Sequence, residues 1–298
     1  MLEIIPFVPL YIKSIEIHHQ ASAALLNRLY ILSMAKQSVK DFYDNEGWKY
    51  AGANSRDAII NENLTEVASN YVHLIRMRIF DAIGSGLNLL DVGCGPIQYS
   101  EYVKYSQNYK TRVCVDLSSE ALKLAKEKIG DHGDFIVGDY LSLPTPKSAP
   151  FDGATLINVL YHVKREDQEK LVRKILSDLK PGAKLVIVYS NPHSPSAIIT
   201  KILVQAKRHL GQLTTRKSGD THQNPIYFFR FPLVFWEQFE DLAEVEIRAW
   251  RTLSPALEKL LFRKLLFGAR LLSIIFKLEN LKWWSRVAEY PLIIMVKR

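Results

Sequence analysis

The chain has 298 residues, with 39 Lys and Arg against 31 Asp and Glu, so its formal net charge is +8 at neutral pH. Hydrophobic residues make up 48% of the sequence and charged residues 23%, the composition of an ordinary globular protein. This excludes a disordered, collagen-like or coiled-coil chain, and the length allows one large domain or two small ones.

The two cysteines and the hydropathy of the sequence indicate in which cellular compartment the protein works. Cys94 and Cys114 stand in no spacing that is typical of a disulfide framework or a zinc site. We therefore expect a reducing, cytoplasmic setting and no metal. The apolar N-terminus carries Glu3 and has no basic leader, which disfavours a secretory signal. The sequence has no run of about 18 apolar residues, so we expect no membrane span.

The N-terminal part is predicted to be a helical cap. A helical pattern covers 22–41, a polar loop with aromatic residues follows at 42–56, and a second helix runs to about Ile83. Two interpretations of Tyr43, Trp48 and Tyr50 in that loop stay open: a lid over a ligand, or local core packing.

Residues 87–190 alternate between strand and helix patterns, which predicts a parallel sheet with helical crossovers. One helix is expected at 119–129, with Ser118 and Ser119 as caps. Another is expected at 165–179, and Pro181-Gly182 then supply its stop and a turn. The expected strands lie at 87–92, 112–116, 134–137, 153–158 and 184–189.

The remainder of the chain is expected to add caps and two closing strands. The pattern predicts a helix at 196–210, a loop at 211–225, a short helix at 233–242 and a strand at 245–250. A helical segment at 251–290 and a last strand at 291–296 follow.

Polar and glycine clusters follow four of the core strands. Gly93-Cys94-Gly95 comes after the first strand, where side-chain-free residues let a ligand approach the backbone. Asp116 ends the second strand, at the position where a carboxylate can bind both hydroxyls of a ribose. Gly138-Asp139 follows the third strand and 158–162 follows the fourth. Because these carboxyl ends share one edge of a parallel sheet, we expect one ligand site there.

With these clusters the sequence resembles the class I S-adenosylmethionine-dependent methyltransferases, and among them the small-molecule branch. The resemblance implies an α/β fold, a Rossmann-like seven-stranded, mostly parallel sheet with an antiparallel last strand and helical cap insertions. It runs from about Leu87 to Val188 and is carried by Leu-Asp-Val-Gly-Cys-Gly-Pro at 90–96, Asp116, Gly-Asp at 138–139, Phe-Asp-Gly at 151–153 with Tyr-His-Val at 161–163, and Leu-Lys-Pro-Gly-Ala-Lys-Leu at 179–185.

The resemblance also implies one domain over 1–298. Its parts are a helical cap at 1–84, a cofactor-binding core at 85–190, cap or substrate elements at 191–242 and 251–289, and closing strands at 243–250 and 290–298.

S-adenosyl-L-methionine is the cofactor that the resemblance implies, and it assigns binding roles residue by residue. Gly93 and Gly95, with Cys94 between them, pass its methionine part. Asp116, with Leu117 beside it, binds the ribose, while Asp139 and Tyr140 bracket the adenine. Asn158 closes the pocket, Tyr43 contacts the cofactor if its loop forms a lid, and Asp91 orients the loop or, through water, the cofactor ammonium. The family often has a third glycine, but here Pro96-Ile97-Gln98 follows Gly95. For the same reason a nicotinamide dinucleotide is disfavoured.

Two histidines are candidates for a general base. Methyl transfer from a sulfonium needs mainly alignment and exclusion of water, but a hydroxyl acceptor must also lose a proton. His162, after the fourth strand, is the first candidate and His193, after the fifth, is the second. The alternative for His162 is simple packing beneath the cofactor.

The positive charge is concentrated in two cap segments. Residues 251–286 hold eight Lys and Arg against two Glu, and 201–222 hold five against one Asp, which leaves the rest slightly acidic. That distribution makes nucleic acid an unlikely partner, as does Val159-Leu160 where nucleic-acid methyltransferases place prolines. The segment 251–286 is also too apolar for a solvated helix. This segment must therefore pack against something. It could cover the protein's own core, a second subunit in a homodimer, or an anionic membrane surface.

We therefore expect a methyltransferase that acts on a small organic acceptor, an anionic or lipid-linked molecule in keeping with the basic caps. The preferred group is a hydroxyl of a sugar, glycolipid or natural product. The enzymatic alternative is C-methylation of a quinone-like lipid at a membrane surface, and the alternative of another class is a catalytically silent scaffold with this fold.

Overall fold

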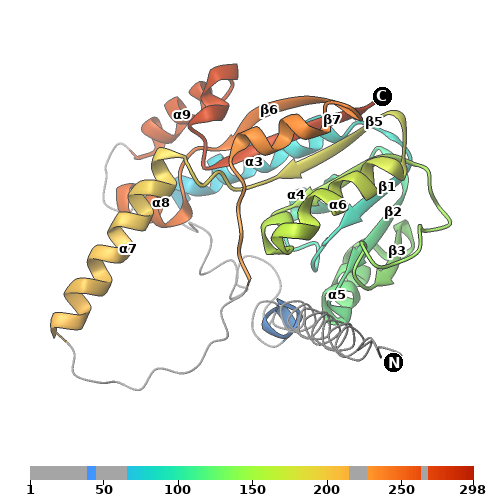
Figure 1. Ribbon diagram of the computed structural model, residues 1–298, viewed down its shortest axis with the longest axis horizontal. Helices are drawn as coiled ribbons and strands as arrows, with labels where there is room; N and C mark the ends of the chain where they lie inside the picture. The colour runs from blue at the N-terminus through green and yellow to red at the C-terminus, as the bar shows by residue number, and fades with distance from the viewer. Residues whose placement is uncertain (1–38, 45–65, 215–226, 263–267) are drawn as a thin grey trace, which may run out of the picture.

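The computed structural model describes residues 39–44, 66–214, 227–262 and 268–298. Within these residues the chain forms a seven-stranded sheet in the order β3-β2-β1-β4-β5-β7-β6 (Figure 1). Strands β1 to β5 are mutually parallel wherever they pair, whereas β7 runs antiparallel to both β5 and β6. The expected Rossmann-like sheet with an antiparallel last strand is thus confirmed. The strands are β1 (Gly86–Val92), β2 (Tyr109–Asp116), β3 (Gly133–Val137), β4 (Phe151–Ile157), β5 (Leu179–Val188), β6 (Ala243–Arg251) and β7 (Tyr290–Lys297).

Helices cover both faces of this sheet. The α-helices that the structure describes after residue 65 are α3 (Glu66–Ile83), α4 (Ser100–Lys104), α5 (Ser119–Ile129), α6 (Arg165–Ser177), α7 (Pro195–Thr214), α8 (Pro255–Phe262) and α9 (Gly268–Leu278). Short 3-10 turns occur at η2 (Gly130–His132), η3 (Leu160–His162), η4 (Leu233–Phe239) and η5 (Lys282–Arg286).

Alternation along the buried strands produces two apolar layers. In β5, Leu185 and Ile187 pack in one cluster with α6 and η4, whereas Val186 and Val188 pack in the other with α3 and α9. Successive side chains of a strand point to opposite faces, so a strand covered on both sides must be apolar at every position. This explains why the core strands read as continuous apolar runs.

Three expected features differ from the structure. Helix α6 ends at Ser177, and Pro181-Gly182 lies inside β5, where the pairing with β4 shifts register. The short helix expected at 233–242 is a 3-10 run. Within the expected helical segment 251–290, Arg251 still belongs to β6, and the structure describes α8, α9 and the 3-10 turn η5; residues 263–267 lie outside the described residues. Most of the expected elements at 22–41 and 42–56 lie outside the described residues.

Among the described residues, no helix is both long and apolar enough to cross a membrane.

Candidate functional site

A cavity of about 780 Å³ lies at the carboxyl edge of the parallel strands. Its size falls within the range of about 300–1,000 Å³ that is typical of small-molecule sites. Two parts of its lining come from different regions of the chain. The motif wall consists of Gly93, Gly95, Asp116, Asp139 and Asn158, and the cap wall of Trp250, Arg251, Pro255 and Tyr290.

The glycine turn after β1 forms the floor of the motif wall. Gly93 and Gly95 have φ of +69° and +56°, where L side chains are strained. The Gly93 N–H donates to the Val115 carbonyl at 2.7 Å, which fixes the turn to β2. A Cβ built on Gly93 would lie 2.4 Å from Val159 Cγ2. Both the backbone angle and the close packing therefore require glycine at position 93.

Asp116 ends β2 beside that turn. Its Oδ2 accepts from the Gly95 N–H and its Oδ1 from the Ser118 N–H, each at 2.9 Å. Burial raises the pKa of Asp116 to about 6, although the two backbone donors oppose the shift. The carboxylate is thus aimed into the cavity and is costly to leave ionised without further donors.

Ile97 occupies the strained position in the loop that lacks a third glycine. Its φ is +49°, an unusual value for a β-branched residue, and its side chain is fully buried. The side chain packs in one cluster with Cys94, Cys114 and Leu122. Packing against α5 therefore holds a backbone conformation that glycine would adopt without strain.

Asp91 lies behind the motif wall and does not line the cavity. Arg112 Nη2 donates to Asp91 Oδ2 at 2.5 Å, and Thr155 Oγ1 donates to Oδ1 at 2.7 Å. The carboxylate therefore ties β1 to β2 and β4. Asp91, Cys94 and Cys114 offer ligand atoms within 4.8 Å of one another. However, a hydrogen bond with Cys114 and burial raise the pKa of the Cys94 thiol, which disfavours the thiolate that a metal needs.

Asp139, Tyr140 and Asn158 lie in the cavity lining as expected. Asp139 accepts from Ser142 Oγ at 2.8 Å and begins the turn after β3, and the Tyr140 hydroxyl donates to Asp178 at 2.6 Å. Asn158 has φ of +59°, a conformation that Asn tolerates. Its Oδ1 is buried and accepts no hydrogen bond from any residue that the structure describes. A bound ligand with a donor group is the simplest way to satisfy this oxygen.

His162 lies in an aromatic part of the cavity, close to Tyr43, Tyr161 and Phe228. Its Nδ1 is 3.0 Å from the Tyr227 carbonyl oxygen. Because a carbonyl can only accept, Nδ1 carries the proton and Nε2 keeps a free lone pair. Burial lowers the pKa of His162 below its usual 6.5, so the ring is neutral at pH 7. The side chain therefore has the charge state that a general base requires.

His193 and Tyr43 have different positions relative to the cavity. His193 is exposed and lies outside the cavity lining. Tyr43 lines the cavity, with its ring centroid 6.4 Å from that of His162. Its loop neighbours Trp48 and Tyr50 lie outside the described residues.

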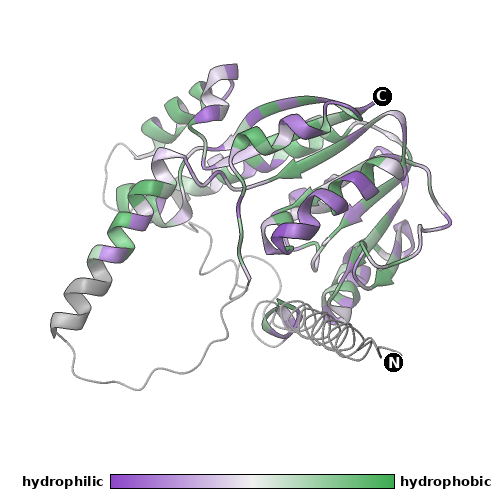
Figure 2. Ribbon diagram, in the orientation of Figure 1, coloured by the Kyte–Doolittle hydropathy of each residue, from purple (hydrophilic) through white to green (hydrophobic). Residues whose placement is uncertain are grey.

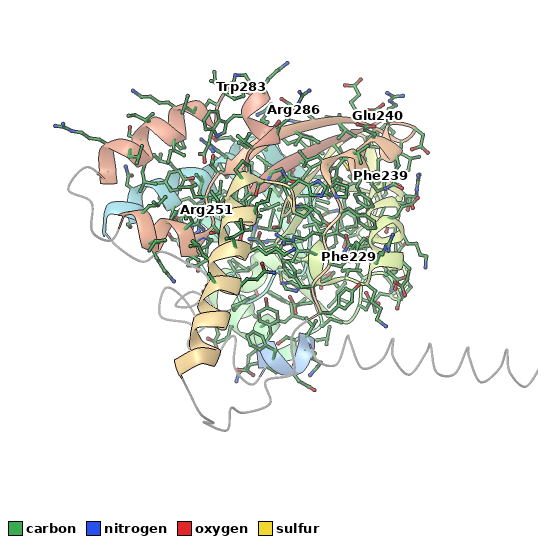
Figure 3. The ribbon with its side chains drawn as sticks, turned by 60° about the vertical axis from the view of Figure 1, so that its left-hand side comes forward. Phe229, Phe239, Glu240, Arg251, Trp283 and Arg286 are labelled. Atoms are coloured by element: carbon green, nitrogen blue, oxygen red, sulfur yellow. The ribbon has the colours of Figure 1, made fainter. Side chains whose placement is uncertain are left out.

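The cap wall was not predicted from the sequence. Arg251 pairs in register with Tyr290 because β6 and β7 are antiparallel, and this brings both to the carboxyl edge of β5. Arg251 Nε and Nη2 each donate to the Glu258 carboxylate at 2.8 Å, which fixes α8 to β6. Figure 3 shows Arg251 beside α8 and α7, away from Phe229 and Phe239. The expected antiparallel last strand was the one sequence signal that could have pointed to the cap wall, because such a strand begins at the carboxyl edge of β5.

Other unpredicted lining residues are aromatic. The Phe229 N–H donates to the Tyr161 carbonyl at 2.8 Å, which positions the preceding Phe228 over the cavity. Tyr99 and Tyr102 line the cavity near α4, and Arg76 stacks on the Tyr99 ring at 3.3 Å. These aromatic rings carry no motif that could have identified them.

Taken together, the residues fit S-adenosyl-L-methionine. The Asp116 carboxylate supplies acceptors for a ribose, the glycine turn leaves the backbone open to a ligand, and the Asn158 oxygen lacks a donor among the described residues. Leu117 and Leu171 offer apolar surface in the same cavity.

Comparison with known proteins gives the family of the core. Residues 90–187, about a third of the chain, match a family model described as a methyltransferase domain. Norajmaline N-methyltransferase of Rauvolfia serpentina is 33% identical over 117 residues, which are 37% of this chain and 39% of that protein. A methyltransferase of Geobacillus sp. strain WCH70 is 28% identical over 126 residues, 42% of this chain and 56% of that protein. The matches thus span about half of these relatives' own lengths or less.

The fold is shared with a solved methyltransferase. The crystal structure of magnesium protoporphyrin IX methyltransferase from Synechocystis PCC 6803 with bound SAH superposes with a TM-score of 0.50. The match covers 88% of this chain and all of that chain at 12% identity. The family model thus identifies residues 90–187 as a methyltransferase domain, and the fold of the chain matches that of a solved methyltransferase with bound SAH.

Proposed function

Because residues 90–187 form a class I S-adenosylmethionine-dependent methyltransferase domain, we propose that this protein transfers a methyl group to a hydroxyl of a small organic acceptor. The observation that carries the choice of a hydroxyl is His162. It is a neutral histidine in the cavity whose Nδ1 proton is held by the Tyr227 carbonyl. Sugars, glycolipids and natural products are the acceptor classes proposed.

The cofactor supplies an activated methyl on a sulfonium, so the protein must bind, orient and deprotonate the acceptor. Asp116 binds the ribose and Gly93 and Gly95 line the methionine end. Asn158 Oδ1 accepts a donor at the closed end of the pocket. With S-adenosyl-L-methionine bound to supply the methyl group, His162 Nε2 would accept the proton that the acceptor hydroxyl loses. The rings of Tyr43, Tyr161 and Phe228 lie next to the His162 ring and would limit the access of water to it.

Two measurements test this proposal. Calorimetry should detect S-adenosyl-L-methionine binding, and Asp116→Ala should weaken it by about tenfold to a hundredfold, because a buried charge-assisted hydrogen bond is lost. Absence of binding heat in the unaltered protein would contradict the enzymatic proposal and favour a catalytically silent scaffold.

His162 is tested on a panel of hydroxyl, amine and quinone acceptors, followed by release of S-adenosylhomocysteine. His162→Ala should keep cofactor affinity but lose about a hundredfold or more in turnover of the hydroxyl acceptor. His193→Ala is the matched control, because that histidine is exposed and lies outside the cavity lining, and it should retain full turnover. Equal turnover of the His162 variant would assign that ring to packing.

The competing acceptors have their own support. One relative is named an N-methyltransferase, which favours amines, and the apolar basic helices α7 to α9 favour a quinone-like lipid methylated on carbon. Turnover of only one acceptor class in the panel decides between them.

A further inference from the structure

Exposed apolar side chains are concentrated at one end of the molecule. The structure describes sixteen exposed large hydrophobic residues, and eleven of them lie in α7, α8, α9 and the segment from Leu281 to Trp283. We call this surface the apolar end. It consists of Ile198, Ile199, Ile202, Leu203 and Val204 on α7, Leu260 and Leu261 on α8, Leu271 and Ile274 on α9, and Leu281 and Trp283 beside η5.

These elements lie together in space. Helix α8 contacts both α7 and α9, and the three helices gather at the side of the molecule away from β1, β2 and β3 (Figure 1). Figure 2 shows green, apolar turns in α7, α8 and α9, interrupted by purple, hydrophilic ones. Single exposed apolar residues are ordinary, but eleven of them on three neighbouring helices and the segment after α9 indicate a binding surface.

The exposed charged side chains on the described elements of the apolar end are all cationic, and the half-exposed Glu246 on the neighbouring β6 interacts with one of them, Lys282. The exposed cations of the apolar end are Lys201, Arg270, Lys277, Lys282 and Arg286. The two carboxylates of the same elements are buried, Glu258 at 0% exposure and Glu279 at 2%.

Both carboxylates form ion pairs inside the protein. Glu258 pairs with Arg251, and Glu279 accepts from Arg78 Nη1 at 2.8 Å and from the Tyr71 hydroxyl at 2.7 Å. The described residues of the apolar end therefore present apolar side chains and positive charge to their surroundings, without an exposed carboxylate.

This chemistry matches an anionic phospholipid surface. Lipid headgroups supply the negative charge, the acyl region accepts the aliphatic side chains, and an exposed tryptophan such as Trp283, 59% exposed, is suited to the boundary between them. A second copy of the chain is a poorer match, because its apolar end would bring cations against cations. We propose that the apolar end docks on the surface of an anionic phospholipid bilayer.

Vesicle sedimentation tests the proposal. The full chain should sediment with vesicles of phosphatidylcholine and phosphatidylglycerol but not with phosphatidylcholine alone, and high salt should release it. The charge reversal Lys277→Glu with Lys282→Glu should weaken binding more than about tenfold. The double change Ile202→Glu with Leu260→Glu should do the same, because two apolar contacts are replaced by charges that the membrane repels.

Matched controls come from the opposite part of the molecule. Leu87→Glu changes a leucine that is 57% exposed at the start of β1, and Lys123→Glu changes a lysine on α5. Both should bind vesicles as the unaltered protein does. Addition of anionic vesicles should also shift tryptophan fluorescence to shorter wavelength, and Trp283→Phe should remove most of that shift.

Three outcomes overturn the proposal. The protein could remain in the supernatant with both vesicle types. The control variants could lose binding as strongly as the apolar-end variants. Analytical ultracentrifugation could instead show a dimer that Ile202→Glu with Leu260→Glu dissociates, which would assign the surface to a second copy. Cofactor affinity measured on the same samples is independent of all three and reports separately on the proposed function.

Discussion

The motif wall and the cap wall face the same cavity, but different interactions hold them in place. In the motif wall, Gly93 and Asp116 are fixed by backbone hydrogen bonds between neighbouring strand ends. In the cap wall, Arg251 is fixed by a buried ion pair with Glu258 on a separate helix. Backbone geometry leaves a recognisable spacing in the sequence, whereas an ion pair between two elements leaves none. The difference teaches that the motif wall can be recognised from the sequence, whereas the cap wall can be recognised only from the folded structure.

The largest expected effect tests how the cap wall is held. Arg251→Met leaves the buried Glu258 carboxylate without its partner, which should cost about 3–5 kcal/mol in the free energy of unfolding. Arg248→Met on the same strand is the control, because the pair Arg248–Glu246 is 54% and 44% exposed and should contribute less than about 1 kcal/mol. Urea denaturation measures both. If both variants lost the same free energy of unfolding, the burial of the Arg251–Glu258 pair would not explain its contribution to stability.

The second prediction tests the backbone basis of the motif wall. Gly93→Ala adds a Cβ at 2.4 Å from Val159 and strains a positive φ, so it should weaken cofactor binding by about thirtyfold or more. Gly182→Ala has a comparable φ of +77° with no atom within 4 Å of its Cβ. The Gly182→Ala variant should be slightly less stable than the unaltered protein and should bind the cofactor with unchanged affinity. Calorimetry of both variants separates the effect of the turn from that of strain alone.

The third prediction concerns pH. Cofactor binding favours ionised Asp116, whose pKa is about 6 in the free protein, so affinity should be constant above pH 6 and fall by up to about tenfold per pH unit below it. Because this pKa is above that of an unfolded aspartate, the same ionisation destabilises the free fold as pH rises to about 6. Calorimetry across pH values measures the affinity.

Asp116→Asn should remove this pH dependence. Asp44, Asp91 and Cys94 interact electrostatically with Asp116, and Asp139 and His162 line the same cavity. Of these, the histidine has its ordinary pKa closest to 6, so His162→Gln serves as the control and should keep the dependence. If the Gln variant lost it and the Asn variant kept it, the titrating group would be the histidine.

The smallest expected effect concerns Ile97. In most positions glycine is less stable than alanine by about 0.5–1 kcal/mol. Here φ is +49°, so Ile97→Gly should be more stable than Ile97→Ala by about 1 kcal/mol, although both lose the buried isoleucine side chain. Thermal melts of the two variants measure the order. If the Ala variant were instead more stable than the Gly variant, the loop would have to leave this backbone conformation when the isoleucine side chain is removed.

Sequence reasoning predicted the sheet well because buried parallel strands must be apolar at successive positions. It placed Asp116, Asp139, Asn158 and His162 correctly at one edge, since each directly follows a strand. It did not place Asp91, because its role depends on Arg112 from the next strand. His193 also follows a strand, but the chain turns outward there and leaves the ring exposed. The cap wall depended on the register between β6 and β7, which no local pattern reports.

Arg251 connects the cavity to the apolar end. It lines the cavity, and through Glu258 it holds α8, the helix that carries Leu260. A ligand that moves Arg251 must therefore also act on the position of α8. If membrane docking prefers one position of α8, thermodynamic reciprocity requires that docking change the affinity for that ligand by the same factor as the ligand changes docking. The two binding events would then report on each other, and a ligand that moves Arg251 could be recognised by its effect on vesicle affinity.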